Sequence, residues 1–176
     1  MGKIGPLLTA FDSPHLSESN TGLGNVLFQV ASTYSISKAF NCEFNGRHLF
    51  EFTEKLAHNF RFHHGETIFR NFLQNTGSKL DRVLYESPNH HKLFDLTLLT
   101  KINDVRDLSL LVQGYMESHL YFDVYENELR KMLSIDDISK KYLQEKYPFL
   151  FDSSRVKIAI HIRTGNSIVE IDKEYY

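Results

Sequence analysis

The sequence predicts an α/β protein whose strands form a mainly parallel sheet. Apolar residues recur at helical spacing over about 24–40, and apolar runs at 108–113 and 156–162 have the pattern of strands. Strands that alternate with helical stretches are typical of βα units, in which neighbouring strands lie parallel. At 176 residues the chain is long enough to bury a substantial core.

The first half of the chain predicts the order strand, loop, helix and strand. Its helix is indicated by Leu23, Leu27 and Tyr34, which share one helical face. The turn after the second strand is indicated by Asn45-Gly46. The expected elements are a strand at 6–11, a loop at 12–20, a helix at about 24–40, a strand at 42–44, and weakly helical stretches at 49–59 and 66–73.

The second half predicts further strands and helices. The expected elements are a strand at 83–85, a mixed stretch to about 107, a strand at 108–113, helices at about 119–133 and 136–147, and a strand at 156–162. Pro148 ends the last helix, because its ring cannot continue the helical hydrogen bonding. A boundary is expected near 148–154, which divides the chain into domains at 1–150 and 151–176.

Composition narrows the range of functions. The formal net charge is −2 and no run of Lys or Arg occurs, which argues against a nucleic-acid partner. Cys42 is the single cysteine, which fits a reducing compartment. No apolar run reaches the roughly 18 residues of a membrane span, and the N-terminus lacks a secretory-signal pattern. We therefore expect a cytoplasmic protein without a transmembrane segment, and the spacing of the histidines predicts no metal site.

A cation follows the last predicted strand. His161 lies within this strand and Arg163 at its end, before a turn built on Gly165 and Asn166. Ligands of open α/β sheets bind outside the carboxyl ends of the strands, and the guanidinium fork of Arg suits phosphate oxygens. The alternative is a core strand whose Arg pairs with surface carboxylates.

Two further segments carry groups suited to binding. Thr21-Gly-Leu-Gly-Asn25 feeds the first helix, where free backbone N–H groups attract anions, although a tight connection explains the same glycines. No Lys-Ser/Thr pair follows, and the third glycine of a dinucleotide fingerprint is absent. Val112-Gln-Gly-Tyr-Met-Glu-Ser-His119 places polar groups after a strand, as an ordinary β–α turn also does.

In this order, the three segments resemble motifs of the α-1,2-fucosyltransferases, a glycosyltransferase family 11-like group that uses GDP-fucose. The matching stretches are Gly22-Leu-Gly-Asn-Val-Leu-Phe-Gln29, Gln113-Gly-Tyr-Met-Glu-Ser118 and His161-Ile-Arg-Thr-Gly-Asn166. The chain departs from the family at Val26, where Gln is usual, at Thr164, where a second Arg is usual, and at Asn166, where Asp is usual.

The resemblance implies a GT-B-like fold with two Rossmann-like domains, and transfer of L-fucose from GDP-fucose to a galactose hydroxyl with inversion and without a metal. It assigns 1–150 to the acceptor-side domain and 151–176 to an incomplete start of the GDP-fucose domain. The implied catalytic residues are Arg163 and His161. The implied donor or cleft residues are Gly22, Gly24, Asn25, Gln29, Arg163 and Asn166. The implied acceptor-side residues are Gly114, Tyr115, Glu117 and Ser118.

Two alternatives to an active transferase stay open. One is a truncated or degenerate module that binds a carbohydrate or partner without catalysis, which the altered residues Thr164 and Asn166 favour. The other is an α/β domain in which the glycines and Arg163 are incidental. Binding of galactosides without nucleotide binding separates the first alternative from an enzyme.

Overall fold

The computed structural model describes residues 1–8, 23–56, 68–80, 82–87 and 93–158. The chain divides into two compact units, Met1–Ile135 and Asp136–Tyr176. The first unit has the α/β architecture that the sequence predicts. The expected division into domains at 1–150 and 151–176 stays a prediction.

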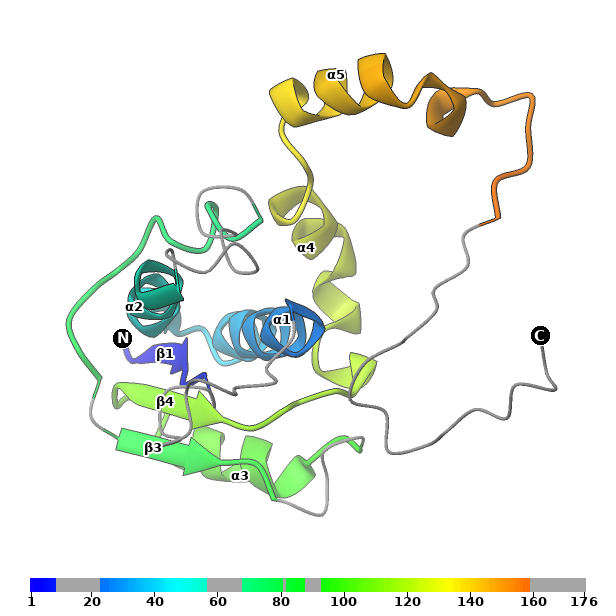
Figure 1. Cartoon of the computed structure of the whole chain (residues 1–176). Coiled ribbons are helices and arrows are strands. Elements are labelled where there is room, and N and C mark those ends of the chain that lie inside the picture. Colours follow the sequence, from blue (N-terminus) through cyan, green and yellow to red (C-terminus); the bar gives the residue numbers. More distant parts are fainter. Residues whose placement is uncertain (9–22, 57–67, 81, 88–92, 159–176) are drawn as a thin grey trace, which may run out of the picture. The chain divides into compact units, whose positions relative to one another are not determined.

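The first unit is built on a sheet of four parallel strands in the order β2-β1-β4-β3 (Figure 1). The strands are β1 (Lys3–Pro6), β2 (Glu43–Phe44), β3 (Arg82–Tyr85) and β4 (Leu110–Gln113). Ile4 of β1 pairs with Phe44 on one side and with Leu110 on the other. The mainly parallel sheet is thus confirmed, and its order is compatible with a Rossmann-like fold.

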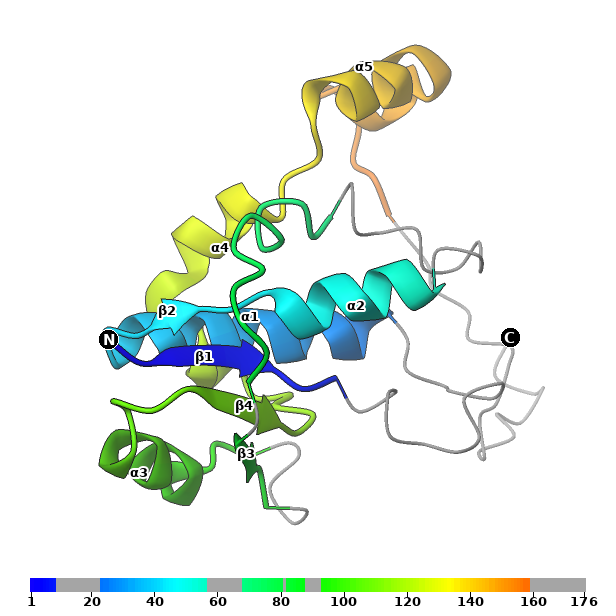
Figure 2. The ribbon, with the colours of Figure 1, turned by 90° about the vertical axis from the view of Figure 1, so that its left-hand side faces the viewer.

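Helices cover one face of this sheet and flank its β2 edge (Figure 2). They are α1 (Leu23–Ala39), α2 (Arg47–Leu56), α3 (Leu96–Asp104) and α4 (Glu126–Met132). Ile36 of α1 and Ile102 of α3 pack in one cluster with Ile4 of the sheet, so α1 and α3 share a face. Leu80 packs with Leu7 and Leu111 in a separate cluster.

α1 is the central helix of this unit. Val30 and Tyr34 pack with Leu49 of α2 and Leu129 of α4, while Ile36 packs against the sheet. Because neighbours surround it, α1 buries small polar residues as well as apolar ones, including Ser32 and others of its second half. A helix enclosed in this way has no wide polar face.

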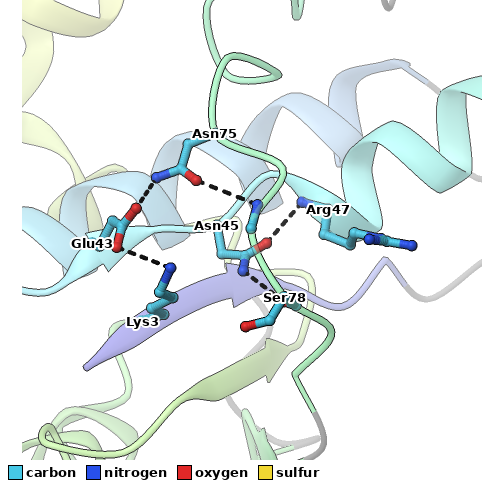
Figure 3. Close-up of polar contacts among 7 residues, drawn as sticks. Lys3, Glu43, Asn45, Arg47, Asn75 and Ser78 are labelled. Atoms are coloured by element: carbon cyan, nitrogen blue, oxygen red, sulfur yellow. Dashed lines mark hydrogen bonds and ion pairs between the residues drawn. The ribbon is translucent and has the colours of Figure 1, made fainter. Parts of the chain in front are cut away.

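A polar network joins the β2–α2 turn to the segment after α2 (Figure 3). The buried Asn45 side chain accepts a hydrogen bond from the Arg47 backbone N–H at 2.9 Å and donates one to the Ser78 carbonyl at 3.0 Å. Glu43 pairs with Lys3 at 3.1 Å and accepts a hydrogen bond from the Asn75 side chain. These contacts join β1, the β2–α2 turn and the segment after α2 at this edge of the sheet.

The first strand lies at Lys3–Pro6, earlier than the predicted 6–11. Leu7 and Leu8 are outside the strand, and 9–11 lie outside the described residues. The shift depends on glycine: a Cβ on Gly5 would lie 2.5 Å from the Asn45 carbonyl oxygen, and one on Gly2 would lie 2.0 Å from the Arg106 carbonyl oxygen. Glycine is disfavoured in strands, so the propensity pattern does not indicate this one. Leu7 still donates its N–H to the Val112 carbonyl at 2.8 Å.

Two predicted helices differ from the structure. In the described part of 66–73, residues 68–73 form turns, with Phe69 and Phe72 buried. The stretch 119–133 is broken into η4 (His119–Tyr121), η5 (Asp123–Tyr125) and α4. The unpredicted α3 begins at Asp95, whose carboxylate accepts a hydrogen bond from the Leu98 N–H.

The second unit is described as far as residue 158. It contains α5 (Asp137–Lys146), which agrees with the expected helix at 136–147, and η6 (Pro148–Phe151). Asp136 begins α5 by accepting a hydrogen bond from the Ser139 N–H at 2.6 Å. Residues 156–158 of the predicted last strand have no strand structure and are exposed, and the rest of that strand lies outside the described residues.

Candidate functional site

A pocket of about 660 Å³ lies between α1 and the segment that follows β4. Its walls are mainly aliphatic and aromatic, whereas charged groups stand at its margin. The lining residues are Gly24, Leu27, Phe28, Ala31, His119, Phe122, Asp123, Glu126, Leu129, Arg130 and Leu133. Pockets of this size and composition are typical of small-molecule sites.

The first turns of α1 form one wall. Among the described residues, a Cβ added to Gly24 would meet no atom within 4 Å outside the backbone of its own helix. Phe28 lies next to Phe122, with ring centroids 5.9 Å apart and planes tilted by 52°. The glycine-rich start of the helix and the segment after β4 therefore border the same pocket, as their places at the carboxyl edge of a sheet predict.

The charged groups at the margin are paired with one another. Arg130 Nη2 lies 2.7 Å from Glu126 Oε1, one helical turn away. His119 Nε2 lies 3.6 Å from Asp123 Oδ2, a pair that is ionic when the imidazole is protonated. All four side chains are more than half exposed, so these pairs contribute little to the stability of the fold.

α4, the opposite wall, is fixed to α1 by Glu128. Its carboxylate accepts a 2.5 Å hydrogen bond from the Tyr34 hydroxyl and lies 3.2 Å from Lys38 Nζ. The Tyr34 hydrogen bond, supported by Lys38, lowers the pKa of the Glu128 carboxyl. Burial and the same hydrogen bond raise the pKa of the Tyr34 hydroxyl. The two walls of the pocket, α1 and α4, are therefore joined by side-chain contacts in the C-terminal half of α1.

The predicted acceptor-side segment follows β4 and is held by a buried carboxylate, Glu86. Glu86 Oε2 accepts a 2.9 Å hydrogen bond from the Met116 N–H, and a Cβ on Gly114 would lie 2.4 Å from Glu86 Cβ. Met116 adopts a φ of 46°, an uncommon value for a non-glycine residue. On its other side, the Met116 carbonyl accepts a 3.2 Å hydrogen bond from Ser32 of α1.

Glu86 belongs to a buried cluster with Tyr121 and Asp95, which the sequence analysis missed. The Tyr121 hydroxyl donates to Glu86 Oε1 at 3.1 Å and accepts from the Asp95 N–H at 2.8 Å. Burial raises the pKa of Tyr121. Asp95 also accepts a hydrogen bond from the Ser87 N–H at 3.0 Å. The position of Glu86 in the sequence could have indicated this cluster, because Glu86 directly follows the predicted strand at 83–85 and polar side chains gather at the carboxyl edge of a parallel sheet.

The predicted site residues that the structure describes lie in two places, near the pocket and near the buried Glu86. Gly24 borders the pocket, Asn25 is half-buried beside it in the first turn of α1, and Gln29 is 1% exposed and belongs to the interior. Ser118 is buried, Gly114 and Glu117 are half-buried, and Tyr115 is exposed.

The predicted residues Gly22, His161, Arg163 and Asn166 lie outside the described residues. Their assignment to the donor site and to catalysis stays a prediction. Among the described residues, no group of three or more His, Cys, Asp or Glu side chains could hold a metal ion. Over the same ranges, none of the helices combines the length and apolar character needed to cross a membrane.

No family model, curated protein or solved structure matches this chain. The parallel sheet and the pocket define an α/β protein with a candidate small-molecule site between α1 and the segment from His119 to Leu133.

Proposed function

We propose that this chain acts as a GDP-fucose-dependent α-1,2-fucosyltransferase of GT-B architecture, with the described α/β unit on the acceptor side. One observation supports this most strongly. Gly24 of the Gly-Leu-Gly-Asn segment lines the pocket. The Gly-Tyr-Met-Glu-Ser segment, 90 positions further along the chain when counted from Gly24 to Gly114, is joined to α1 by the 3.2 Å hydrogen bond from Ser32 to the Met116 carbonyl and leads into His119, which also lines the pocket.

The proposed reaction moves fucose in a single displacement. The acceptor oxygen forms a bond to the anomeric carbon of fucose from the face opposite to GDP, the bond to the β-phosphate oxygen breaks, and the acceptor proton passes to a base. Charge then develops on the β-phosphate, and Arg163 is the cation that stabilises it. Among the residues that the structure describes, the candidate for this base is Glu117, a half-buried carboxylate in the acceptor-side segment.

A transfer assay with labelled GDP-fucose and a galactoside acceptor tests the proposal. Purified chain should transfer fucose, and Arg163→Ala should lower the rate at least about tenfold, because a charge-assisted hydrogen bond contributes about 1.5–3 kcal/mol. The matched control is Arg155→Ala, an exposed arginine that pairs with Asp152 at 3.1 Å and should leave the rate unchanged. Equal rates for wild type and Arg163→Ala would contradict the role of Arg163.

A non-catalytic galactoside-binding module is the second candidate, and the departures at Thr164 and Asn166 favour it. A neutral Thr offers no guanidinium to a diphosphate, and Asn166 cannot act as a carboxylate. Calorimetry distinguishes the two. Saturable binding of a galactoside with no binding of GDP or GDP-fucose would replace the enzyme with the binding module.

A further inference from the structure

We propose that the pocket between α1 and α4 binds the apolar part of an amphipathic, uncharged glycoside, so that the acceptor is a lipid-linked or aryl-linked sugar and not a free saccharide. The galactose headgroup in this proposal rests on the proposed function. The apolar tail rests on the pocket itself.

The inner walls favour a tail of hydrocarbon. Leu27, Phe28 and Ala31 line the pocket from α1, and Leu129 and Leu133 line it from α4 and the residue after it. Leu129 is 4% exposed and Ala31 7% exposed, so both form the floor, while Leu27, Phe28 and Leu133 remain half-buried. An alkyl or aryl group that covers these side chains removes their remaining apolar surface from water. A free sugar, with hydroxyl groups on every side, would leave several without partners there.

The margin of the pocket favours a neutral headgroup. Its titratable side chains form the Arg130–Glu126 and His119–Asp123 pairs, so Arg130, the one arginine or lysine among the described residues that line the pocket, already has a carboxylate partner. An anionic headgroup would have to separate Arg130 from Glu126 to gain a partner. Sugar hydroxyl groups can instead donate to the carboxylates and accept from the cations while both pairs stay formed.

The walls are also placed for binding without major rearrangement. The Glu128 contacts with Tyr34 and Lys38 join α4 to α1, and the Phe28 and Phe122 rings meet at the pocket. Their tilted arrangement offers an aromatic edge and face to a ligand at the mouth, where Gly24 leaves open space. A largely pre-formed site loses little conformational entropy on binding.

Calorimetry with three probes tests this inference on the full chain. Octyl β-galactoside, below its micelle concentration, should bind at least about tenfold more tightly than methyl β-galactoside, because only the octyl chain fills the pocket. Octanoate should bind more weakly than octyl β-galactoside, because its carboxylate would meet Asp123 and Glu126 at the margin while Arg130 is already paired with Glu126. Equal affinities for the two galactosides would overturn the tail site, and octanoate binding as tight as that of octyl β-galactoside would overturn the neutral headgroup.

Variants locate the site. Leu133→Ser, at a half-buried position of the wall, should weaken octyl β-galactoside at least about fivefold. Leu120→Ser is the matched control, since Leu120 is exposed nearby but does not line the pocket, and it should bind as wild type. Thermal unfolding shows whether each variant folds, and Ala31→Phe, which fills the pocket from α1, provides a second variant. Unchanged binding in both folded pocket variants would overturn the proposal.

The result is separable from the proposed function. Octyl β-galactoside that binds in the pocket but receives no fucose from GDP-fucose would leave the tail site standing and contradict the transferase. Transfer to methyl β-galactoside as efficient as transfer to octyl β-galactoside would confirm the transferase and contradict the tail site.

Discussion

The two glycines that indicated a binding site from the sequence occupy opposite kinds of environment. Gly114, after β4, is enclosed: an added Cβ would lie 2.4 Å from Glu86 Cβ and 2.6 Å from Glu86 Oε2. Gly24, in the first turn of α1, borders the pocket, and an added Cβ would meet nothing within 4 Å in the described part of the chain outside the backbone of its own helix. The fold requires the first glycine, whereas nothing in the described fold requires the second.

This difference separates the scaffold from the site. Around Gly114, the buried hydrogen bonds of Glu86, Tyr121 and Asp95 fix the course of the chain at the carboxyl edge of the sheet. Around Gly24, apolar side chains remain accessible and the charges are paired at the surface. Packing does not require a glycine at position 24, so the space beside Gly24 is available to a ligand.

The largest effect is expected at Gly114. Gly114→Ala should lower the free energy of unfolding by about 2–3 kcal/mol, because the new Cβ displaces the buried Glu86 carboxylate. Chemical denaturation measures this, and Gly24→Ala is the matched control, expected to be neutral or to stabilise α1 by up to about 1 kcal/mol. Similar changes for the two variants would remove the distinction between the enclosed and the open glycine.

The next effect concerns Tyr121. Tyr121→Phe should destabilise the protein by about 1–3 kcal/mol, because Glu86 loses a donor and the Asp95 N–H loses its acceptor inside the protein. The control is Tyr85→Phe, since Tyr85 is 63% exposed. A loss no larger than that of the control would show that the cluster does not hold the edge.

The same tyrosine predicts an alkaline effect. Its pKa is raised in the folded protein, so above the ordinary tyrosine pKa of about 10 the unfolded chain loses the phenolic proton while the folded chain retains it. Stability should therefore fall as pH rises above about 10, and less steeply in Tyr121→Phe. Parallel stability–pH curves for the two proteins would contradict this origin.

A smaller effect is expected at Gly24 on binding. Gly24→Ala places a methyl group in the pocket and should weaken octyl β-galactoside by about threefold or more, which is about 0.7 kcal/mol, without loss of stability. Titration of the folded variant measures this. Wild-type affinity in Gly24→Ala would show that the ligand does not use this part of the pocket.

The smallest effect is expected at Glu128. Its lowered pKa means that its contribution to stability is present above the unfolded pKa of about 4.3 and is lost as pH falls through the folded value. Because its side chain is 42% exposed, Glu128→Gln should cost only about 0.5 kcal/mol at neutral pH, with the difference from wild type shrinking below pH 4. A constant difference down to acidic pH would contradict the ion pair as its source.

Local patterns were enough for the elements with strong periodicity. The helix at about 24–40 is found at Leu23–Ala39, the strands at 42–44, 83–85 and 108–113 are found within two residues of their expected bounds, and α5 agrees with 136–147. The apolar face of 119–133 is also confirmed, because Phe122, Tyr125 and Met132 pack against the core. Its continuous helix was wrong, and Tyr121 within the broken part reaches the buried Glu86.

What the sequence could not show depends on contacts between distant residues. Gly5 of β1 and Gly2 just before it are explained by the neighbouring Asn45 and Arg106 carbonyls. The Glu86–Tyr121 hydrogen bond joins positions 35 residues apart. The glycine motifs indicated two segments without distinguishing their roles: Gly24 lines the pocket, whereas Gly114 packs against Glu86.

The most direct test is a map of ligand contacts by NMR. Octyl β-galactoside titrated into isotope-labelled protein should shift the amide signals of Gly24, Phe28 and Phe122, which border the pocket. It should leave those of Glu86 and Asp95, in the buried cluster, nearly unchanged. Shifts centred on Glu86 and Asp95, or no saturable shifts at Gly24 and Phe28, would contradict the assignment of scaffold and site.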